Sequence, residues 1–201
     1  MIGLARGSIA LCDHNKEWEV EAARTAAHLR GILGKTARAV EHIGSTAVPT
    51  IKAKPIIDIA VGADRLSDVL AYEERLAADG FFYRHAVDGR GNIFPGLRRL
   101  NDNIERLLFA CGDYYTGGTL QTHFIHAVRY GGATWNDYIL FRDCLRSDPD
   151  LAREYERLKT SLAQSTGDRY AYTDGKSAFV EKALERCKAA RAEVDNGGRL
   201  C

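Results

Sequence analysis

Two short apolar runs, joined by a Gly-Ser-Thr turn and a basic segment, constrain the fold of this chain more than any other feature. The runs are ARAVEHIG (residues 37–44) and KPIIDIAVG (residues 54–62), and Gly or Pro bounds each of them. Both are rich in β-branched residues, which favour extended backbone, whereas Gly and Pro interrupt regular structure. This region therefore predicts two neighbouring strands.

Helical periodicity surrounds these strands. Apolar residues recur at helical spacing over residues 16–33, 65–79 and 134–147. Asp148 and Pro149 then fit the cap and first turn of another helix. A last helix is predicted from about Asp174, before the polar end of the chain.

Further strands are predicted in the middle of the chain. FFYRH (81–85), ERLLFAC (105–111) and THFIHAV (122–128) have strand composition, and a Gly- and Tyr-bearing turn joins the last two. Residues 86–103 hold three glycines and a proline and predict a long loop, which is often a functional feature. This order of elements favours an α+β fold with a mixed sheet and a C-terminal helical cap.

Composition limits the classes of partner and compartment. The chain has 201 residues and a net charge of +1, which gives no reason to expect bulk nucleic-acid binding. No segment approaches the roughly 20 apolar residues of a membrane span. The five cysteines are scattered and odd in number, which argues against a disulfide framework and a zinc ribbon. We therefore expect a cytoplasmic protein.

A single carboxylate, Asp58, lies inside the second apolar run. Side chains alternate along a strand, so Ile57, Ile59 and Val61 share one face while Asp58 and Ala60 share the other. A charged carboxylate among apolar residues is costly unless it is paired, binds a metal or faces a cleft. The small Ala60 favours a cleft. An ion pair with Arg or Lys and a metal-ligand role are equally open for Asp58.

The turn between the runs offers groups that bind anions. After Gly44, the backbone N–H groups and the hydroxyls of Ser45 and Thr46 can approach a phosphate. Lys52 and Lys54 follow and can neutralise phosphate charge, although lysines in loops are usually only solvated. The pattern is not a Walker A loop, because a proline stands where that motif has Gly-Lys.

The combination of these features resembles a known family. The segment EHIGSTAVPTIKAKPIIDIAV (41–61) closely resembles the signature of the GrpB family, also called UPF0157. The resemblance continues through THFIHAV, FRDCLRSDP, REYERLK and YTDGKSAFVEKA, and so covers about residues 18–183. It implies a nucleotidyltransferase-like fold in a single domain, residues 1–195, with an α/β core (1–132), a helical cap (133–195) and a disordered tail (196–201).

The resemblance also implies site residues. In the nucleotidyltransferase superfamily a Gly-Ser turn grips nucleotide phosphates, and two acids on the next strand hold Mg²⁺. Gly44 and Ser45 match the turn, and Asp58 matches the first acid. The second acid falls on Ala60, which departs from the pattern. We therefore expect Mg²⁺ and ATP or another NTP, with the two-metal route in doubt.

Two histidines complete the candidate site. THFIHAV stands where related proteins usually have His-His-x-His, so Phe124 replaces the middle residue while His123 and His126 remain. Because they are three apart, they lie on opposite faces of a strand unless a bulge intervenes. At most one of them then shares a face with Asp58.

The leading hypothesis is a Mg²⁺-dependent, NTP-binding, nucleotidyltransferase-like enzyme. It would transfer a nucleotidyl or activated group to a small-molecule acceptor, for example by adenylation and ligation of a carboxylate. The alternative is a non-catalytic nucleotide-binding or regulatory module, for which the missing second acid is the best argument. The expected catalytic residues are Asp58, His123 and His126, and the expected phosphate-binding residues are Gly44, Ser45, Thr46, Lys52 and Lys54.

Overall fold

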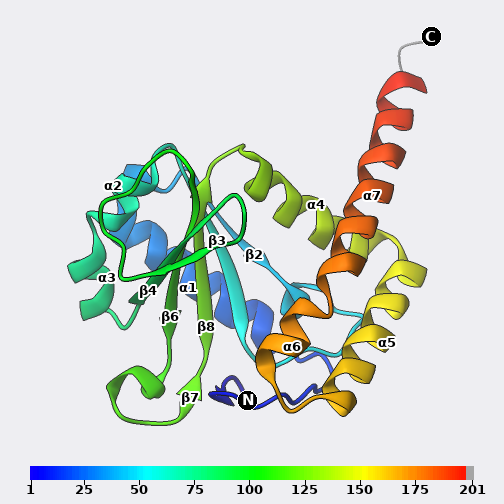
Figure 1. The fold of residues 1–201 in the computed structure, drawn as a ribbon, viewed down its shortest axis with the longest axis horizontal. Helices are drawn as coiled ribbons and strands as arrows, with labels where there is room; N and C mark the ends of the chain where they lie inside the picture. The colour runs from blue at the N-terminus through cyan, green and yellow to red at the C-terminus, as the bar shows by residue number, and fades with distance from the viewer. Residues whose placement is uncertain (198–201) are drawn as a thin grey trace.

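A computed structural model describes residues 1–197 of the chain as a mixed α+β fold (Figure 1). Its main sheet contains, in spatial order, β2 (Ala39–Ile43), β3 (Ile57–Ala63), β8 (His123–Arg129), β6 (Ile104–Cys111), β4 (Phe82–Asp88) and β5 (Ile93–Pro95). A separate pair joins β1 (Leu4–Ala5) to β7 (Leu120–Gln121). Short 3₁₀ turns lie at η1 (Gly34–Thr36), η2 (Ser45–Ala47) and η3 (Asp113–Thr116).

The sheet is mixed because one of its strand pairs is parallel. β3 runs parallel to β8, whereas β2–β3, β8–β6, β6–β4 and β4–β5 are antiparallel. A parallel pair needs a long crossover connection, and here the chain makes β4, β5 and β6 before it returns to β3. The predicted α+β class and mixed sheet are therefore confirmed.

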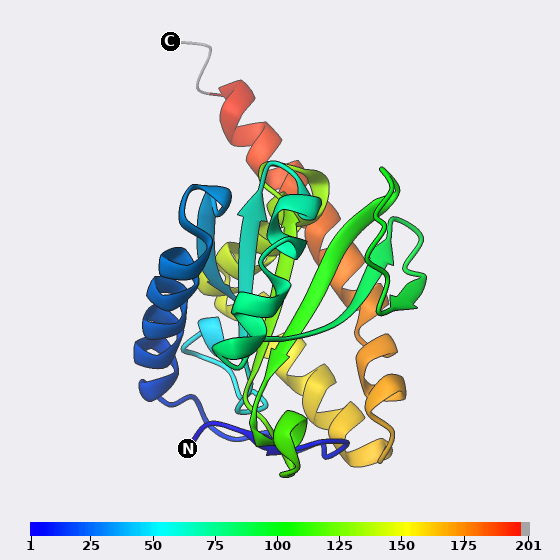
Figure 2. The ribbon, with the colours of Figure 1, turned by 90° about the vertical axis from the view of Figure 1, so that its left-hand side faces the viewer.

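One face of the sheet forms the main apolar core. It packs against α1 (Glu17–Leu33), α2 (Leu66–Leu70) and α3 (Glu73–Ala78), and Figure 2 shows α1 running alongside the strands. Trp18 of α1 is buried in this core together with Ile57, Ile59 and Val61 of β3. The face predicted to be apolar from the alternation along β3 is therefore the core face.

The C-terminal helices lie beside the other face. They are α4 (Ala133–Ser147), α5 (Pro149–Ser165), α6 (Arg169–Asp174) and α7 (Ser177–Gly197), and Figure 1 shows them grouped on the side of β2. Trp135 of α4 closes a small apolar cluster with Ile43, Ala60 and Val128 from three strands. A second cluster joins α4, α5 and α7 to the segment 48–51.

Several element boundaries differ from the sequence prediction. The helix predicted over 65–79 is two helices, α2 and α3, and the segment predicted as a loop, 86–103, contains the short edge strand β5. The helix predicted from about Asp174 is α7, which begins at Ser177, and the short helix α6 before it was not predicted. α7 reaches Gly197, residues 198–201 lie outside the described part of the chain, and the disordered tail stays a prediction.

The structure corrects the expectation about cysteines. A disulfide joins Cys144 of α4 to Cys187 of α7, with their Cα atoms 6.5 Å apart. The two cysteines are 43 residues apart in the sequence, so the sequence alone does not indicate that they pair. The disulfide can form because α4 and α7 pack side by side. Within residues 1–197, no helix is both long and apolar enough to span a lipid bilayer.

Candidate functional site

Asp58 and His126 meet on the face of the sheet that carries the C-terminal helices. The His126 Nε2 atom lies 3.2 Å from Asp58 Oδ1, and the side chains are 15% and 29% exposed, respectively. The backbone register explains the contact, because Asp58 is opposite Phe124 and Ala60 is opposite His126 in the parallel pair. These four side chains therefore share one face, on adjacent strands.

His123 lies on the opposite face of the sheet. It is buried beside α1, where its Nε2 atom is 3.2 Å from the Thr25 hydroxyl and 3.4 Å from a Glu21 carboxylate oxygen. The expectation that only one of the two histidines joins Asp58 is met, and that histidine is His126. The structure thus separates His123 from the Asp58 group, since no bulge interrupts the pairing of β8 with β3.

His126 is held in its neutral form by its surroundings. Burial lowers the pKa of His126, and the hydrogen bond and charge of Asp58 oppose this shift. A carboxylate only accepts hydrogen bonds, so His126 donates from Nε2. Its Nδ1 atom is buried and has no hydrogen-bond partner within the described residues. The ring therefore offers an unused acceptor.

Gly44 brings the turn after β2 against the carboxylate of Asp58. Its φ is +71°, in the region that favours glycine, and η2 follows directly. A Cβ atom at this position would lie only 2.5 Å from Asp58 Oδ2. Glycine is therefore required at position 44 for two reasons: the conformation of the turn and its close approach to the carboxylate.

The two hydroxyls of this turn have different surroundings. Thr46 is 1% exposed, and its Oγ1 atom lies 2.9 Å from His42 Nε2, so it stabilises the turn instead of facing Asp58. Ser45 faces Tyr155 of α5. Burial raises the pKa of Tyr155 to about 12, and a hydrogen bond with Ser45 opposes that shift. Ser45 is thus the turn hydroxyl at the junction with the helices.

Two lysines bring positive charge to Asp58. Lys54 and Lys176 both stack on the ring of Tyr172, with Nζ 3.9 Å and 4.6 Å from its centroid. Burial, then the charges of Lys176 and Arg169, lower the pKa of Lys54 to about 8, and Asp58 opposes the shift. Burial also lowers the pKa of Lys176, again opposed by Asp58.

Lys52 does not join this group. Its side chain is 45% exposed, and its Nζ atom forms an ion pair of 2.6 Å with Asp13. The hydrogen bond and charge of Asp13 raise the pKa of Lys52. The structure therefore separates the two lysines that the sequence placed together: Lys54 faces Asp58, and Lys52 faces the surface.

Sequence reasoning left the helical part of the site without assigned roles. Lys176 belongs to one of the family-like blocks, YTDGKSAFVEKA, and that block was the available signal. Tyr155 and Tyr172 gave no such signal in the sequence, because aromatic residues at helical spacing indicate an apolar core. We call the resulting group the Asp58 cluster: Gly44, Ser45, Lys54, Asp58, His126, Tyr155, Tyr172 and Lys176.

Ala60 corrects the expectation of an open cleft along β3. It lies on the same face as Asp58, but its side chain is 0% exposed and packs in the cluster with Trp135. No group of three or more His, Cys, Asp or Glu side chains suited to a metal occurs within residues 1–197. Asp58 is thus a single carboxylate whose neighbour position is filled by apolar packing.

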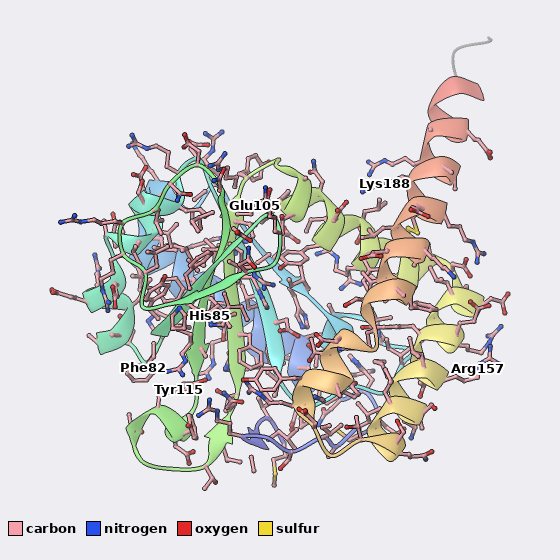
Figure 3. The ribbon with its side chains drawn as sticks, viewed as in Figure 1. Phe82, His85, Glu105, Tyr115, Arg157 and Lys188 are labelled. Atoms are coloured by element: carbon pink, nitrogen blue, oxygen red, sulfur yellow. A yellow bond between two sulfur atoms is a disulfide. The ribbon has the colours of Figure 1, made fainter. Side chains whose placement is uncertain are left out.

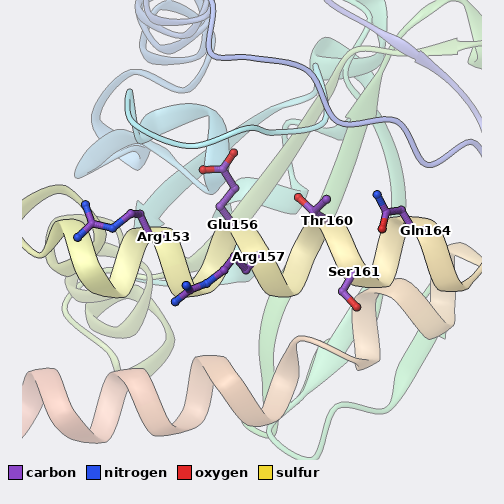
Figure 4. Close-up of a pocket in the computed structure, with 6 residues that line it drawn as sticks. All are labelled: Arg153, Glu156, Arg157, Thr160, Ser161 and Gln164. Carbon is purple, nitrogen blue, oxygen red and sulfur yellow. The ribbon is translucent and has the colours of Figure 1, made fainter.

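A surface hollow elsewhere does not involve this cluster. It runs along α5 and is lined by Arg153, Glu156, Arg157, Thr160, Ser161 and Gln164 (Figure 4). All six residues come from one helix, and none belongs to the Asp58 cluster. The polar centre between the sheet and the helices remains the better candidate site.

Comparison with known proteins identifies the family. The model of the GrpB protein family matches residues 8–186, which include the whole Asp58 cluster. The chain belongs to the GrpB family. This GrpB chain is 34% identical to the glutamate-rich protein GrpB of Alkalihalophilus pseudofirmus over 92% of its own length and 98% of that protein. It is 30% identical to the UPF0157 protein YqkA of Bacillus subtilis, over 94% of this chain but only 50% of YqkA.

One solved structure agrees with this assignment. The conserved protein GrpB from Enterococcus faecalis matches with a TM-score of 0.71 at 27% identity, over 89% of this GrpB chain and 96% of that one. Cid1 in complex with its short product ApU is a weaker match, with a TM-score of 0.47 at 16% identity, over 73% of this chain and 41% of Cid1.

Proposed function

We propose that this chain is a nucleotidyltransferase-like enzyme that binds ATP or another NTP and transfers a nucleotidyl or activated group to a small-molecule acceptor in the cytoplasm. One observation carries the proposal: a carboxylate, Asp58, is held by His126 beside a glycine turn and within the field of Lys54 and Lys176. Two half-buried cations and one carboxylate leave an excess of positive charge, which suits a polyphosphate.

The roles of the residues follow from these contacts. Lys54 and Lys176 would neutralise the phosphates, and Ser45 would donate its hydroxyl to them. His126 would hold Asp58 through its Nε2–H. Its unpartnered Nδ1 would be free to accept a proton from the attacking group of the acceptor. Thr46, Lys52 and His123 have no direct part in this scheme, because other side chains engage them.

The residues fit Mg²⁺ only in part. This ion prefers oxygen ligands and often takes one or two carboxylates plus the phosphates of a substrate. Asp58 would supply the one protein ligand, and the nucleotide and water would supply the others. When bound, the ion would offset phosphate charge next to the two lysines. Metal and nucleotide should then bind together, each strengthening the other by the same factor.

A second candidate function is a nucleotide-binding or regulatory module without turnover. The burial of Ala60 against Trp135 favours it, because the position of the second acid in the superfamily pattern is filled by apolar contacts. Both candidates require a nucleotide at the Asp58 cluster, and only the first requires a reaction.

Calorimetric titration of ATP and Mg²⁺ into the parent and Asp58→Asn tests the shared claim. We expect the parent to bind and the variant to lose most of that affinity while staying folded. Asp13→Asn is the matched control, since Asp13 is exposed and pairs with Lys52. Equal affinity in all three proteins would disprove the site. Mass spectrometry for pyrophosphate or NMP release, with candidate acceptors, then separates the enzyme from the binding module.

A further inference from the structure

A row of side chains extends from the Asp58 cluster across the sheet. In the register of four strands, Ala60 is opposite His126, His126 opposite Leu108, and Leu108 opposite His85. Neighbouring strands are about 4.8 Å apart, so His85 lies roughly 10 Å from His126 on the same face. Leu108 and His85 are half-buried. In Figure 3, His85 lies towards the β4 end of the sheet, far from α5.

Three arginines place positive charge near His85. Burial, followed by the charges of Arg106, Arg84, His126 and Arg169, lowers the pKa of His85 to about 4. Arg84 and Arg106 come from β4 and β6, whereas Arg169 is the first residue of α6. Three arginines from separate elements thus act electrostatically on one half-buried histidine of the sheet.

These arginines have no carboxylate partner within the described residues. Arg106 donates from Nη1 to the Tyr138 hydroxyl at 2.9 Å, and its Nε atom is buried without a partner. Arg84 stacks on the Tyr115 ring with its Cζ atom 4.9 Å from the ring centroid, and Arg169 donates to the Tyr170 hydroxyl. Three like charges without counter-charges repel one another, and an anion between them removes that cost.

Two stacked aromatic rings border this stretch of the sheet. Phe82 stacks on Tyr115 with ring centroids 5.6 Å apart, and both are labelled next to each other in Figure 3. We call the group of Phe82, Arg84, His85, Arg106, Tyr115 and Arg169 the arginine surface. It adjoins the Asp58 cluster through His126, but it shares no residue with that cluster.

We propose that the arginine surface binds an anionic group, a carboxylate or a phosphate, of the acceptor molecule. This inference rests on the proposed function and adds the chemical class of the second substrate. An acceptor held by its anionic group at the arginines would direct its other end along the row towards His126 and the nucleotide. The buried, unpartnered Nε of Arg106 and Nδ1 of His126 mark the two ends of this path.

The test is NMR titration of the full-length chain with inorganic phosphate and, separately, with succinate, each with and without saturating ATP and Mg²⁺. The shifts of the Arg106 side-chain N–H groups and the His85 ring report binding at the arginine surface. We expect one of the two anions to bind there, which distinguishes a phosphate from a carboxylate. ATP should not displace it.

Three variants locate the binding. Arg106→Gln and Arg169→Gln should each weaken anion binding about tenfold or more, because each removes a charge-assisted hydrogen bond. Arg106→Lys keeps the charge and should retain part of the affinity. Arg99→Gln is the matched control, since Arg99 is exposed on the loop 96–103. The affinity for ATP should stay within about twofold in Arg106→Lys, which keeps the charge near His126, and in Arg99→Gln.

The outcomes separate this inference from the proposed function. If neither anion binds, if the glutamine variants bind as well as the parent, or if ATP displaces the anion, the arginine surface is not an acceptor site. Nucleotide binding at Asp58 can survive each of those results. Anion binding at the arginines in a chain that binds no nucleotide would instead overturn the proposed function and the acceptor role together.

Discussion

At the scale of single residues, the sequence was a better guide to which side chains lie near Asp58 than to the contacts that each of them makes. Strand alternation correctly gave Asp58 a face separate from Ile57 and Ile59. It also predicted that at most one histidine would share that face. That this histidine is His126 depends on the register of β8 with β3, two segments far apart in the sequence. Likewise, no local sequence signal predicts that Lys52 and Lys54 have different surroundings.

Nucleotide affinity should depend on the protonation of Lys54. Its pKa is lowered to about 8 in the free protein, and a bound phosphate would raise it because the phosphate favours the charged form. Affinity for ATP should therefore be greatest below pH 8 and fall by at most about tenfold per pH unit above it. Calorimetry between pH 7 and 9.5 measures this trend. Lys54→Met should bind more weakly at low pH and lose most of the dependence, whereas Lys52→Met should behave like the parent.

Gly44 should tolerate no side chain. Gly44→Ala places a Cβ 2.5 Å from Asp58 Oδ2 at a positive φ, so we expect a loss of about 2 to 4 kcal/mol in the free energy of unfolding, and weaker nucleotide binding. Gly34→Ala is the matched control, because Gly34 also has a positive φ but no heavy atom within 4 Å of the added Cβ. Urea denaturation of both variants measures the difference. Equal losses would mean that contact with Asp58 contributes nothing.

At the scale of elements, the positions of the strands were predicted more accurately than the ends of the helices. The runs at β2, β3, β6 and β8 were located within a few residues, because β-branched composition and bounding Gly or Pro are local signals. The break between α2 and α3 was missed, since apolar spacing continues across it, and the six-residue helix α6 was not predicted. β5 was missed because a three-residue edge strand exists only through its pairing with β4.

The packing of α4 against β3 predicts the result of restoring the missing acid. Ala60→Asp would bury a carboxylate among Ile43, Val128 and Trp135, so we expect a loss of about 3 kcal/mol or more in stability and no stronger binding of Mg²⁺ alone. Ala39→Asp is the control, because Ala39 lies at the partly buried margin of the same cluster on edge strand β2. Thermal unfolding and Mg²⁺ titration test both variants. A stable Ala60→Asp that binds Mg²⁺ tightly would contradict this account.

At the scale of the whole molecule, one buried lysine connects α5 to the segment between β2 and β3. Lys159 of α5 is 1% exposed, and its Nζ donates to the Lys52 carbonyl and stacks on the Tyr155 ring. The sequence predicted a helical cap in this region, but this connection depends on tertiary packing that no local pattern encodes. The division into an α/β core and a cap stays a prediction.

The stability of the chain should rise with pH because of Lys159. Burial lowers its pKa from 10.5 to about 7, so between these values the unfolded chain binds a proton that the folded chain lacks. Stability should then increase by up to about 1.4 kcal/mol per pH unit in that window, and Lys159→Met should flatten the slope. Urea denaturation at several pH values measures it. Lys188→Met, on the exposed part of α7, should leave the slope unchanged.

The single parallel pair, β3 with β8, also sets the order in which the molecule can assemble. The hairpin-like pair of β2 and β3 joins residues close in sequence, whereas Asp58 and His126 are 68 residues apart. Closing such a long stretch of chain is slow and carries a large loss of entropy before any contact forms. During synthesis, Asp58 must therefore leave the ribosome and wait, without its histidine, until the sequence beyond residue 129 has emerged. The Asp58 cluster is complete only after Tyr172 and Lys176 have also been made.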